Sequence, residues 1–175
     1  MRVVAGEFKG RPLRAPRGRR TRPTADKVRE ALFSILGDID GLCVLDLFAG
    51  SGALGIEALS RGAGGAVFVD SDPQAVAAIR RNLDAVGVQA EVHRRDVLAF
   101  LSATSGPRYD LVFADPPYDC AARLGGPLSQ SLPGLLTDQA KIVTESDKRA
   151  PLELDLPLLT ERAYGDTRIA VHASG

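Results

Sequence analysis

The chain has 175 residues, with 22 Lys and Arg, 22 Asp and Glu, and 45% hydrophobic residues. These proportions are those of a globular protein and exclude a disordered or fibrous one, and the length fits one domain. No run of 18 apolar residues occurs, which excludes a membrane-spanning helix. The two cysteines, Cys43 and Cys120, lack the spacing of a disulfide framework or zinc site. We therefore expect a cytoplasmic protein that binds no metal.

The zero net charge conceals an uneven charge distribution. Residues 1–35 carry ten basic and three acidic side chains, a net charge of +7, and the remaining 140 residues carry −7. Because guanidinium groups pair with phosphates and displace counterions, this composition is typical of a nucleic-acid-binding arm. A solvated arm without a partner would have the same composition, and nothing in it reads a base sequence. The candidate binding residues are Arg14, Arg17, Arg19, Arg20 and Arg22.

The first elements in chain order form a segment that differs from the rest. Weak alternation of apolar residues predicts a small β-hairpin within residues 1–13, which an Arg-rich loop follows. Thr24 is placed to cap a helix over Ala25–Leu36. We expect residues 1–40 to form a basic N-terminal extension and residues 41–175 to form the main domain.

From residue 41 onward, predicted strands alternate with predicted helices. The strands are Cys43–Phe48, Ala66–Val69, Glu91–Arg95, Leu111–Ala114 and Lys141–Thr144, with a C-terminal antiparallel hairpin of Leu158–Tyr164 and Thr167–His172. The helices are Ala53–Ser60, Pro73–Ala85 and the short Val97–Leu101, while Cys120–Thr137 shows no clear pattern. The alternation predicts an α/β fold with a Rossmann-like, mostly parallel twisted sheet, which binds ligands beyond the carboxyl ends of its strands.

The strongest local signal is the glycine-rich segment Asp46–Gly55, which follows the first strand. Gly50, Gly52 and Gly55 have the G-x-G-x-x-G spacing of a dinucleotide-binding turn, whose N–H groups would face a pyrophosphate. Asp46 weighs against that interpretation, because a carboxylate repels a pyrophosphate and attracts a cation such as an amino group. By itself, the glycine spacing leaves both kinds of ligand open.

Acidic residues also follow the next two predicted strands. Asp70 stands where a carboxylate can accept hydrogen bonds from two ribose hydroxyls, and Asp96 could accept from an adenine amino group. Each acid alone could equally cap a helix or lie on the surface. Together with Asp46 and the glycines, they favour S-adenosylmethionine, an adenosine with a zwitterionic tail. The candidate cofactor-binding residues are Asp46, Phe48, Ala49, Gly50, Ser51, Gly52, Asp70, Ser71, Asp96 and Val97.

The second signal is Asp115-Pro116-Pro117-Tyr118, after the fourth strand. The prolines stiffen the turn and leave carbonyl groups able to accept hydrogen bonds. A carboxylate and a carbonyl that accept from one exocyclic amine would draw its lone pair out of conjugation, ready to attack an electrophilic methyl group. Tyr118 could stack on an extruded base, although a rigid turn with a packed tyrosine would look the same. The candidate catalytic residues are Asp115, Pro116 and Tyr118, and Cys120 is not among them.

These motifs resemble those of a known family. Asp46–Gly55 resembles motif I of class I S-adenosylmethionine-dependent methyltransferases, and Asp115–Tyr118 resembles their (D/N)PPY amino-methylating motif. Arg22–Phe33, Val44–Ala63 and Arg162–Thr167 resemble the RsmD-type methyltransferases, which methylate the N2 amine of a guanine in 16S ribosomal RNA. Residues 119–139 match least well, being rich in Gly, Ser and Pro where a clearer helix would be expected.

The resemblance implies a role for individual residues and a partner. It implies that Asp46, Gly50 and Gly52 hold the cofactor, with Asp70 on the ribose, Asp96 near the adenine, and Asp115 and Tyr118 at the target base. It also implies a monomer that acts on 16S ribosomal RNA within an assembled or assembling small subunit. Three alternatives stay open, namely a DNA adenine-N6 or cytosine-N4 methyltransferase, a protein-glutamine methyltransferase, and a nucleotide-binding module without catalysis.

Overall fold

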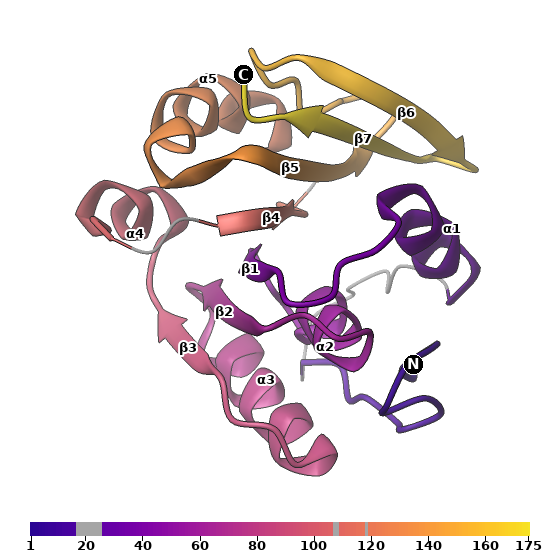
Figure 1. The fold of residues 1–175 in the computed structure, drawn as a ribbon. Helices are drawn as coiled ribbons and strands as arrows, with labels where there is room; N and C mark the ends of the chain where they lie inside the picture. The colour runs from indigo at the N-terminus through magenta and orange to yellow at the C-terminus, as the bar shows by residue number, and fades with distance from the viewer. Residues whose placement is uncertain (17–25, 107–108, 118) are drawn as a thin grey trace.

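The computed structural model describes residues 1–16, 26–106, 109–117 and 119–175, which form a twisted sheet with helices on both faces (Figure 1). The strands are β1 (Cys43–Leu47), β2 (Gly65–Asp70), β3 (Glu91–Arg94), β4 (Tyr109–Ala114), β5 (Leu136–Asp147), β6 (Leu158–Tyr164) and β7 (Thr167–Ala173). Their order in the sheet is β3-β2-β1-β4-β5-β7-β6. Strands β1 to β5 run parallel, and β7 is antiparallel to both β5 and β6. The predicted fold class is confirmed.

The helices cover the sheet in two layers. They are α1 (Asp26–Leu36), α2 (Ala53–Ser60), α3 (Pro73–Val86), α4 (Val97–Ala103) and α5 (Ala121–Ser131), followed by the short η1 (Pro133–Leu135). Apolar side chains of α1, α2 and α3 pack in one core cluster, and those of α4 and α5 pack in the other. Because side chains alternate along a strand, neighbours such as Val44 and Leu45 enter opposite clusters. Among the described residues, no helix is both long and apolar enough to cross a membrane.

Two predicted elements differ from the structure in the second half of the chain. Helix α5 (Ala121–Ser131) occupies most of the stretch in which no pattern was visible, despite Gly125, Gly126 and Pro127 within it. A Cβ atom on Gly125 would lie 2.0 Å from the Glu153 carbonyl oxygen, so this glycine is required by close tertiary packing. Strand β5 (Leu136–Asp147) extends beyond the predicted Lys141–Thr144 at both ends, because Leu136 pairs with Tyr109 of β4 and the strand pairs with β7 as far as Asp147.

The N-terminal strap, which we define as residues 1–14, doubles back on itself beside α2. Its ends are joined by hydrogen bonds, including Leu13 N–H to the Met1 carbonyl (2.9 Å). The hairpin predicted here is reduced to a single antiparallel bridge between Arg2 and Pro12. Val3 and Leu13 are buried in the same cluster as the apolar face of α1. The predicted cap, Thr24, and the predicted first helical residue, Ala25, both lie outside the described residues, and the described part of α1 is Asp26–Leu36.

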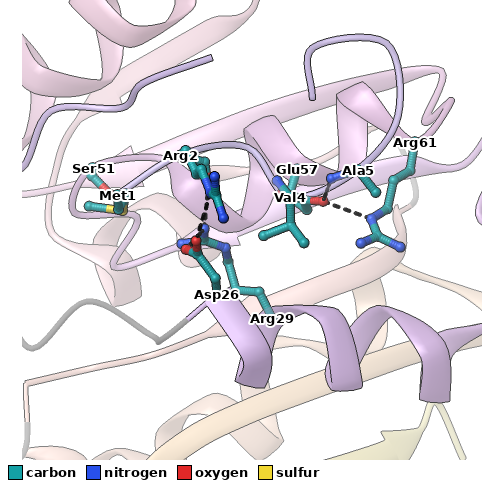
Figure 2. Close-up of polar contacts among 9 residues, drawn as sticks. All are labelled: Met1, Arg2, Val4, Ala5, Asp26, Arg29, Ser51, Glu57 and Arg61. Atoms are coloured by element: carbon teal, nitrogen blue, oxygen red, sulfur yellow. Dashed lines mark hydrogen bonds and ion pairs between the residues drawn. The ribbon is translucent and has the colours of Figure 1, made fainter. Parts of the chain in front are cut away.

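Buried polar groups of α2 hold the strap in place. The Glu57 carboxylate accepts hydrogen bonds from the N–H groups of Val4 (2.7 Å) and Ala5 (2.9 Å), and it pairs with Arg61 (Figure 2). Ser60 Oγ accepts from the Phe8 N–H (2.9 Å). Strap and helix are therefore tied together directly after the glycine-rich segment, where the candidate site begins.

Candidate active site

Four acidic side chains gather at the carboxyl edge of the sheet. Asp46 lies level with Phe68 of β2 and Phe113 of β4, and Phe113 lies level with Val143 of β5. Because side chains alternate, positions two residues beyond these partners point to the same face as Asp46. These positions are Asp70, Asp115 and Glu145. The structure thus brings three of the predicted acids together and adds a fourth, Glu145, to which the sequence assigned no role.

A tight turn connects β1 to α2 above this edge. Phe48 (φ 57°), Gly50 (φ 58°) and Gly52 (φ 77°) all adopt left-handed backbone conformations. Phe48 is the only residue other than glycine among the described ones with a positive φ, and it lies outside β1, which ends one residue earlier than predicted. Non-glycine residues in this region of φ and ψ are strained and occur frequently at functional sites. Ala49, Gly50 and Ser51 of the turn are half-buried.

The third glycine of the motif is required by packing. A Cβ atom on Gly55 would lie 2.3 Å from Phe68 Cε1, so only glycine lets α2 approach β2 this closely. The Gly55 N–H donates to Asp46 Oδ2 (2.9 Å). The helix N-terminus therefore directs this N–H to a protein carboxylate, whereas the dinucleotide interpretation of the spacing would direct such groups to a pyrophosphate.

Burial and neighbouring negative charges raise the pKa values of two acids of the cluster, Asp46 and Asp115. Burial raises the pKa of Asp46 to about 8, and the charge of Asp70 adds to this effect, although the hydrogen bond from Gly55 opposes it. The pKa of Asp115 lies well above its usual value because of desolvation and the negative charges of Glu145 and Asp46. Such a cluster is stabilised by a cation, which favours the ionised form of each carboxyl group. The site therefore fits a positively charged ligand better than an anionic one.

Asp70 also holds the glycine-rich turn. Its Oδ2 accepts from the Gly50 N–H (2.9 Å), and its Oδ1 accepts from the Asp72 N–H (2.8 Å). Since a carboxylate oxygen has two lone pairs, each oxygen can still accept a ribose hydroxyl. Asp70 is therefore placed both to shape the turn and to bind a ligand there.

Asp96 lies at the end of the neighbouring strand, β3, and caps α4. Its Oδ1 accepts from the Ala99 N–H (3.0 Å), which is the helix-capping alternative that the sequence left open. Ser71 is exposed and Val97 is buried in the core. The structure therefore gives Asp96 a structural contact, and its contact with an adenine stays a prediction.

The proline turn follows β4 at the same edge. Pro116 is buried, and the Pro117 carbonyl accepts from both the N–H (3.1 Å) and the Sγ (3.2 Å) of Cys120. Because the Pro117 carbonyl is already used in this way, the Pro116 carbonyl is the candidate that would accept a hydrogen bond from a substrate amine together with Asp115. Cys120 has a structural contact in this turn, in keeping with its exclusion from the candidate catalytic residues.

Several candidates lie outside the described residues. They are Tyr118 of the proline turn and Arg17, Arg19, Arg20 and Arg22 of the basic segment. Arg14 is described and is exposed at the end of the strap. Among the described residues, no three His, Cys, Asp or Glu side chains are arranged to hold a metal ion.

Comparison with known proteins identifies the family. Residues 1–173 match the family described as Conserved hypothetical protein 95. The chain belongs to this family, that of the RsmD-type methyltransferases. It is 38% identical over 155 residues to the Escherichia coli (strain K12) protein named ribosomal RNA small subunit methyltransferase D, covering 84% of this chain and 75% of that protein. It is also 39% identical over 189 aligned positions to YlbH of Bacillus subtilis (strain 168), covering 98% of each.

A solved structure extends the similarity to three dimensions. A hypothetical protein of Thermus thermophilus superposes with a TM-score of 0.85 at 34% sequence identity, covering 99% of both chains. That protein therefore shares this arrangement of strands and helices over nearly the whole chain. The chain is a methyltransferase by family and by fold.

Proposed function

We propose that this protein transfers a methyl group from S-adenosylmethionine to the N2 amine of a guanine in 16S ribosomal RNA of the small subunit, as a cytoplasmic monomer. The observation that carries the proposal is the meeting of two features at one sheet edge. The first is a buried acidic cluster that favours a cation, and the second is a proline turn whose Asp115 faces the same cluster. The names of the relatives support the choice of ribosomal RNA.

The cofactor would be held by the glycine-rich turn. S-adenosylmethionine supplies a sulfonium-bound methyl group, whose transfer leaves the neutral thioether S-adenosylhomocysteine. The Asp46 carboxylate would bind the cationic amino group of the cofactor, and Asp70 would accept from the ribose hydroxyls. Asp96 would lie near the adenine. The raised pKa of Asp46 fits this role, because a bound cation favours its ionised form.

The proline turn would prepare the amine. Asp115 and the Pro116 carbonyl would accept the two hydrogens of the guanine NH₂ group, so its lone pair points toward the methyl carbon. With the cofactor bound, the new N–C bond would form as the C–S bond breaks, and the amine would then give up one proton to water. Such a displacement depends more on alignment than on a strong base, so positioning supplies most of the acceleration. Tyr118 would stack on the flipped base.

The decisive test uses labelled S-adenosylmethionine with small ribosomal subunits that lack this methylation. We expect label in 16S RNA, recovered after digestion as N2-methylguanosine. Label in duplex DNA or in a protein glutamine would favour one of the two alternative methyltransferases. Binding of the cofactor without transfer to any of these substrates would favour a nucleotide-binding module.

Replacing Asp70 with Ala should weaken S-adenosylmethionine binding by about tenfold or more, since hydrogen bonds to a charged group are each worth about 1.5–3 kcal/mol. Titration calorimetry measures the change. Asp72→Ala is the matched control, because it removes an acid two residues away that caps α3 through the Gln74 N–H. Unchanged affinity in Asp70→Ala, or an equal loss of affinity in Asp72→Ala, would show that Asp70 does not bind the ribose of the cofactor.

Residues 1–40 would form the RNA-facing extension. Replacing Arg17, Arg19 and Arg20 together with Ala should lower RNA affinity and reduce the slope of log K against log salt by about 2–3, since each lost phosphate contact removes about 0.7–0.9. Filter binding at several salt concentrations measures this slope. A control variant with Lys148, Arg149 and Arg162 replaced makes the same charge change, with Arg162 on β6 at one edge of the sheet. An equal slope change in both variants would mean that the arm has no special role.

A further inference from the structure

Asn82, on α3, joins the N-terminal strap to the glycine-rich turn. Its Nδ2 donates to the Ser51 carbonyl (2.8 Å) and to the Arg14 carbonyl (3.0 Å), and its Oδ1 accepts from the Arg14 N–H (2.9 Å). Asn82 is 1% exposed. Both amide hydrogens and one acceptor position are therefore used within a single planar group. Any displacement of Arg14 that turns this plane also disturbs the bond to Ser51.

The first residue of the strap, Met1, contacts Ser51 directly. Ser51 Oγ donates to the Met1 sulfur (3.6 Å; Figure 2), and the Met1 carbonyl in turn accepts from the Leu13 N–H. Ser51 is thus linked to Met1 directly and to Arg14 through Asn82. It lies between Gly50 and Gly52, the two left-handed glycines of the turn. The neighbouring Gly50 N–H donates to Asp70. A continuous series of hydrogen bonds and peptide units therefore connects Arg14 to the carboxylate that would hold the ribose.

The strap is also a basic surface. Lys9, Arg11 and Arg14 are exposed on it, and the basic segment of the sequence continues directly beyond it. The proposed phosphate-binding side chains and the proposed cofactor turn are therefore linked through one buried amide. A simple anchor for the strap would not need a bond to the turn, because Glu57 and Ser60 already hold the strap from α2.

We propose that Asn82 is a positioning residue that couples RNA binding at the strap to cofactor binding at the glycine-rich turn, an inference that rests on the proposed function. RNA that immobilises Arg14 fixes the plane of the Asn82 amide and thereby orders the Ser51 carbonyl. The cofactor then binds a turn that is already ordered and loses less conformational entropy. By thermodynamic linkage, the cofactor tightens RNA binding by the same factor.

The test measures the dissociation constant of S-adenosylhomocysteine, which cannot react, with and without saturating small ribosomal subunits that lack the methylation. In the wild type we expect the subunits to lower this constant about fivefold or more, within the usual range of coupling between sites. In Asn82→Ala the two constants should be nearly equal. The reciprocal measurement, subunit affinity with and without S-adenosylhomocysteine, should give the same ratios.

Two control variants separate coupling from loss of stability. Leu83→Ala removes a buried apolar side chain from the same helix and leaves the hydrogen-bonding groups of Asn82 in place, and Ser60→Ala removes the hydrogen bond that Ser60 accepts from Phe8 of the strap. Both variants should keep the wild-type ratio of the two S-adenosylhomocysteine dissociation constants, measured with and without subunits.

If Asn82→Ala does not fold, Asn82→Asp serves in its place. An aspartate at this position retains the acceptor for the Arg14 N–H but, when ionised, cannot donate to the Ser51 carbonyl. A ratio near one in the wild type, or a wild-type ratio in both Asn82 variants, overturns the inference. Methylation by the wild type is scored separately and tests only the proposed function.

Discussion

Replacing Asp115 with Ala should lower the rate of methyl transfer by about 1000-fold and leave S-adenosylmethionine affinity nearly unchanged. Loss of one preorganised polar group at a reacting centre typically costs about 100- to 1000-fold in rate. We expect an effect in the upper part of this range, because the Asp115 carboxylate would both orient the amine and draw its lone pair out of conjugation with the ring. Single-turnover methylation measures the rate, and titration calorimetry measures the affinity.

The matched control for this variant is Asp119→Ala. Asp119 is an exposed acid in the same connection between β4 and α5, four residues from Asp115. It should retain a rate within about threefold of the wild type, since exposed substitutions usually have small effects. Loss of cofactor binding in Asp115→Ala would assign this carboxylate to the cofactor rather than the amine. An equal loss of rate in both variants would show that the effect is not specific to Asp115.

The second large effect concerns stability and pH, through Asp46. Its pKa in the folded protein, about 8, lies above the ordinary value of 3.8, so the folded state binds more protons than the unfolded state between these values. Folding stability therefore falls as pH rises through this window, by about 1.4 kcal/mol per pH unit for one such group. The contribution is fully present below pH 3.8 and is lost above pH 8.

Asp46→Asn removes this titration and keeps an oxygen that can accept from Gly55. Between pH 5 and pH 8, the unfolding free energy of the wild type should fall by about 4 kcal/mol relative to that of the variant. Urea unfolding at several pH values measures the difference between the two proteins, in which the titrating groups remote from the acidic cluster cancel. The variant should also bind S-adenosylmethionine more weakly, because it cannot offer a negative charge to the amino group.

An exposed acid provides the comparison for this experiment. Asp84→Asn makes the same chemical change on the outer side of α3, where the side chain is solvated. Its unfolding free energy should lie within about 0.5 kcal/mol of that of the wild type, since exposed substitutions usually have small effects. If Asp46→Asn also follows the wild type, the carboxyl group of Asp46 is ionised in the folded protein at neutral pH and the electrostatic account of the site is wrong.

Most of the parallel sheet and the site that it carries could be predicted from local sequence. Buried parallel strands are short apolar runs, so β1, β2 and β4 were visible with bounds close to those observed. Parallel strands that share one sheet also share a carboxyl edge. Asp46, Asp70 and Asp115, at or near the ends of these strands, lie at that one edge in the structure.

The elements that were missed depend on contacts between distant parts of the chain. Gly125 and Pro127 have unfavourable helix propensities, and α5 forms because it packs closely over the segment that contains Glu153. The outer part of β5 is stabilised by pairing with β7, which follows it in sequence only after β6. No local pattern indicates such a pairing.

Short-range chemistry was thus sufficient for the fold class, the glycine-rich turn and the proline turn, because each depends on residues within about ten positions of one another. Tertiary structure alone placed Glu145 beside Asp115, raised the pKa of Asp46 and joined Arg14 to Ser51 through Asn82. These properties arise from strand order, burial and helix packing, and all three are set by which distant segments share a core.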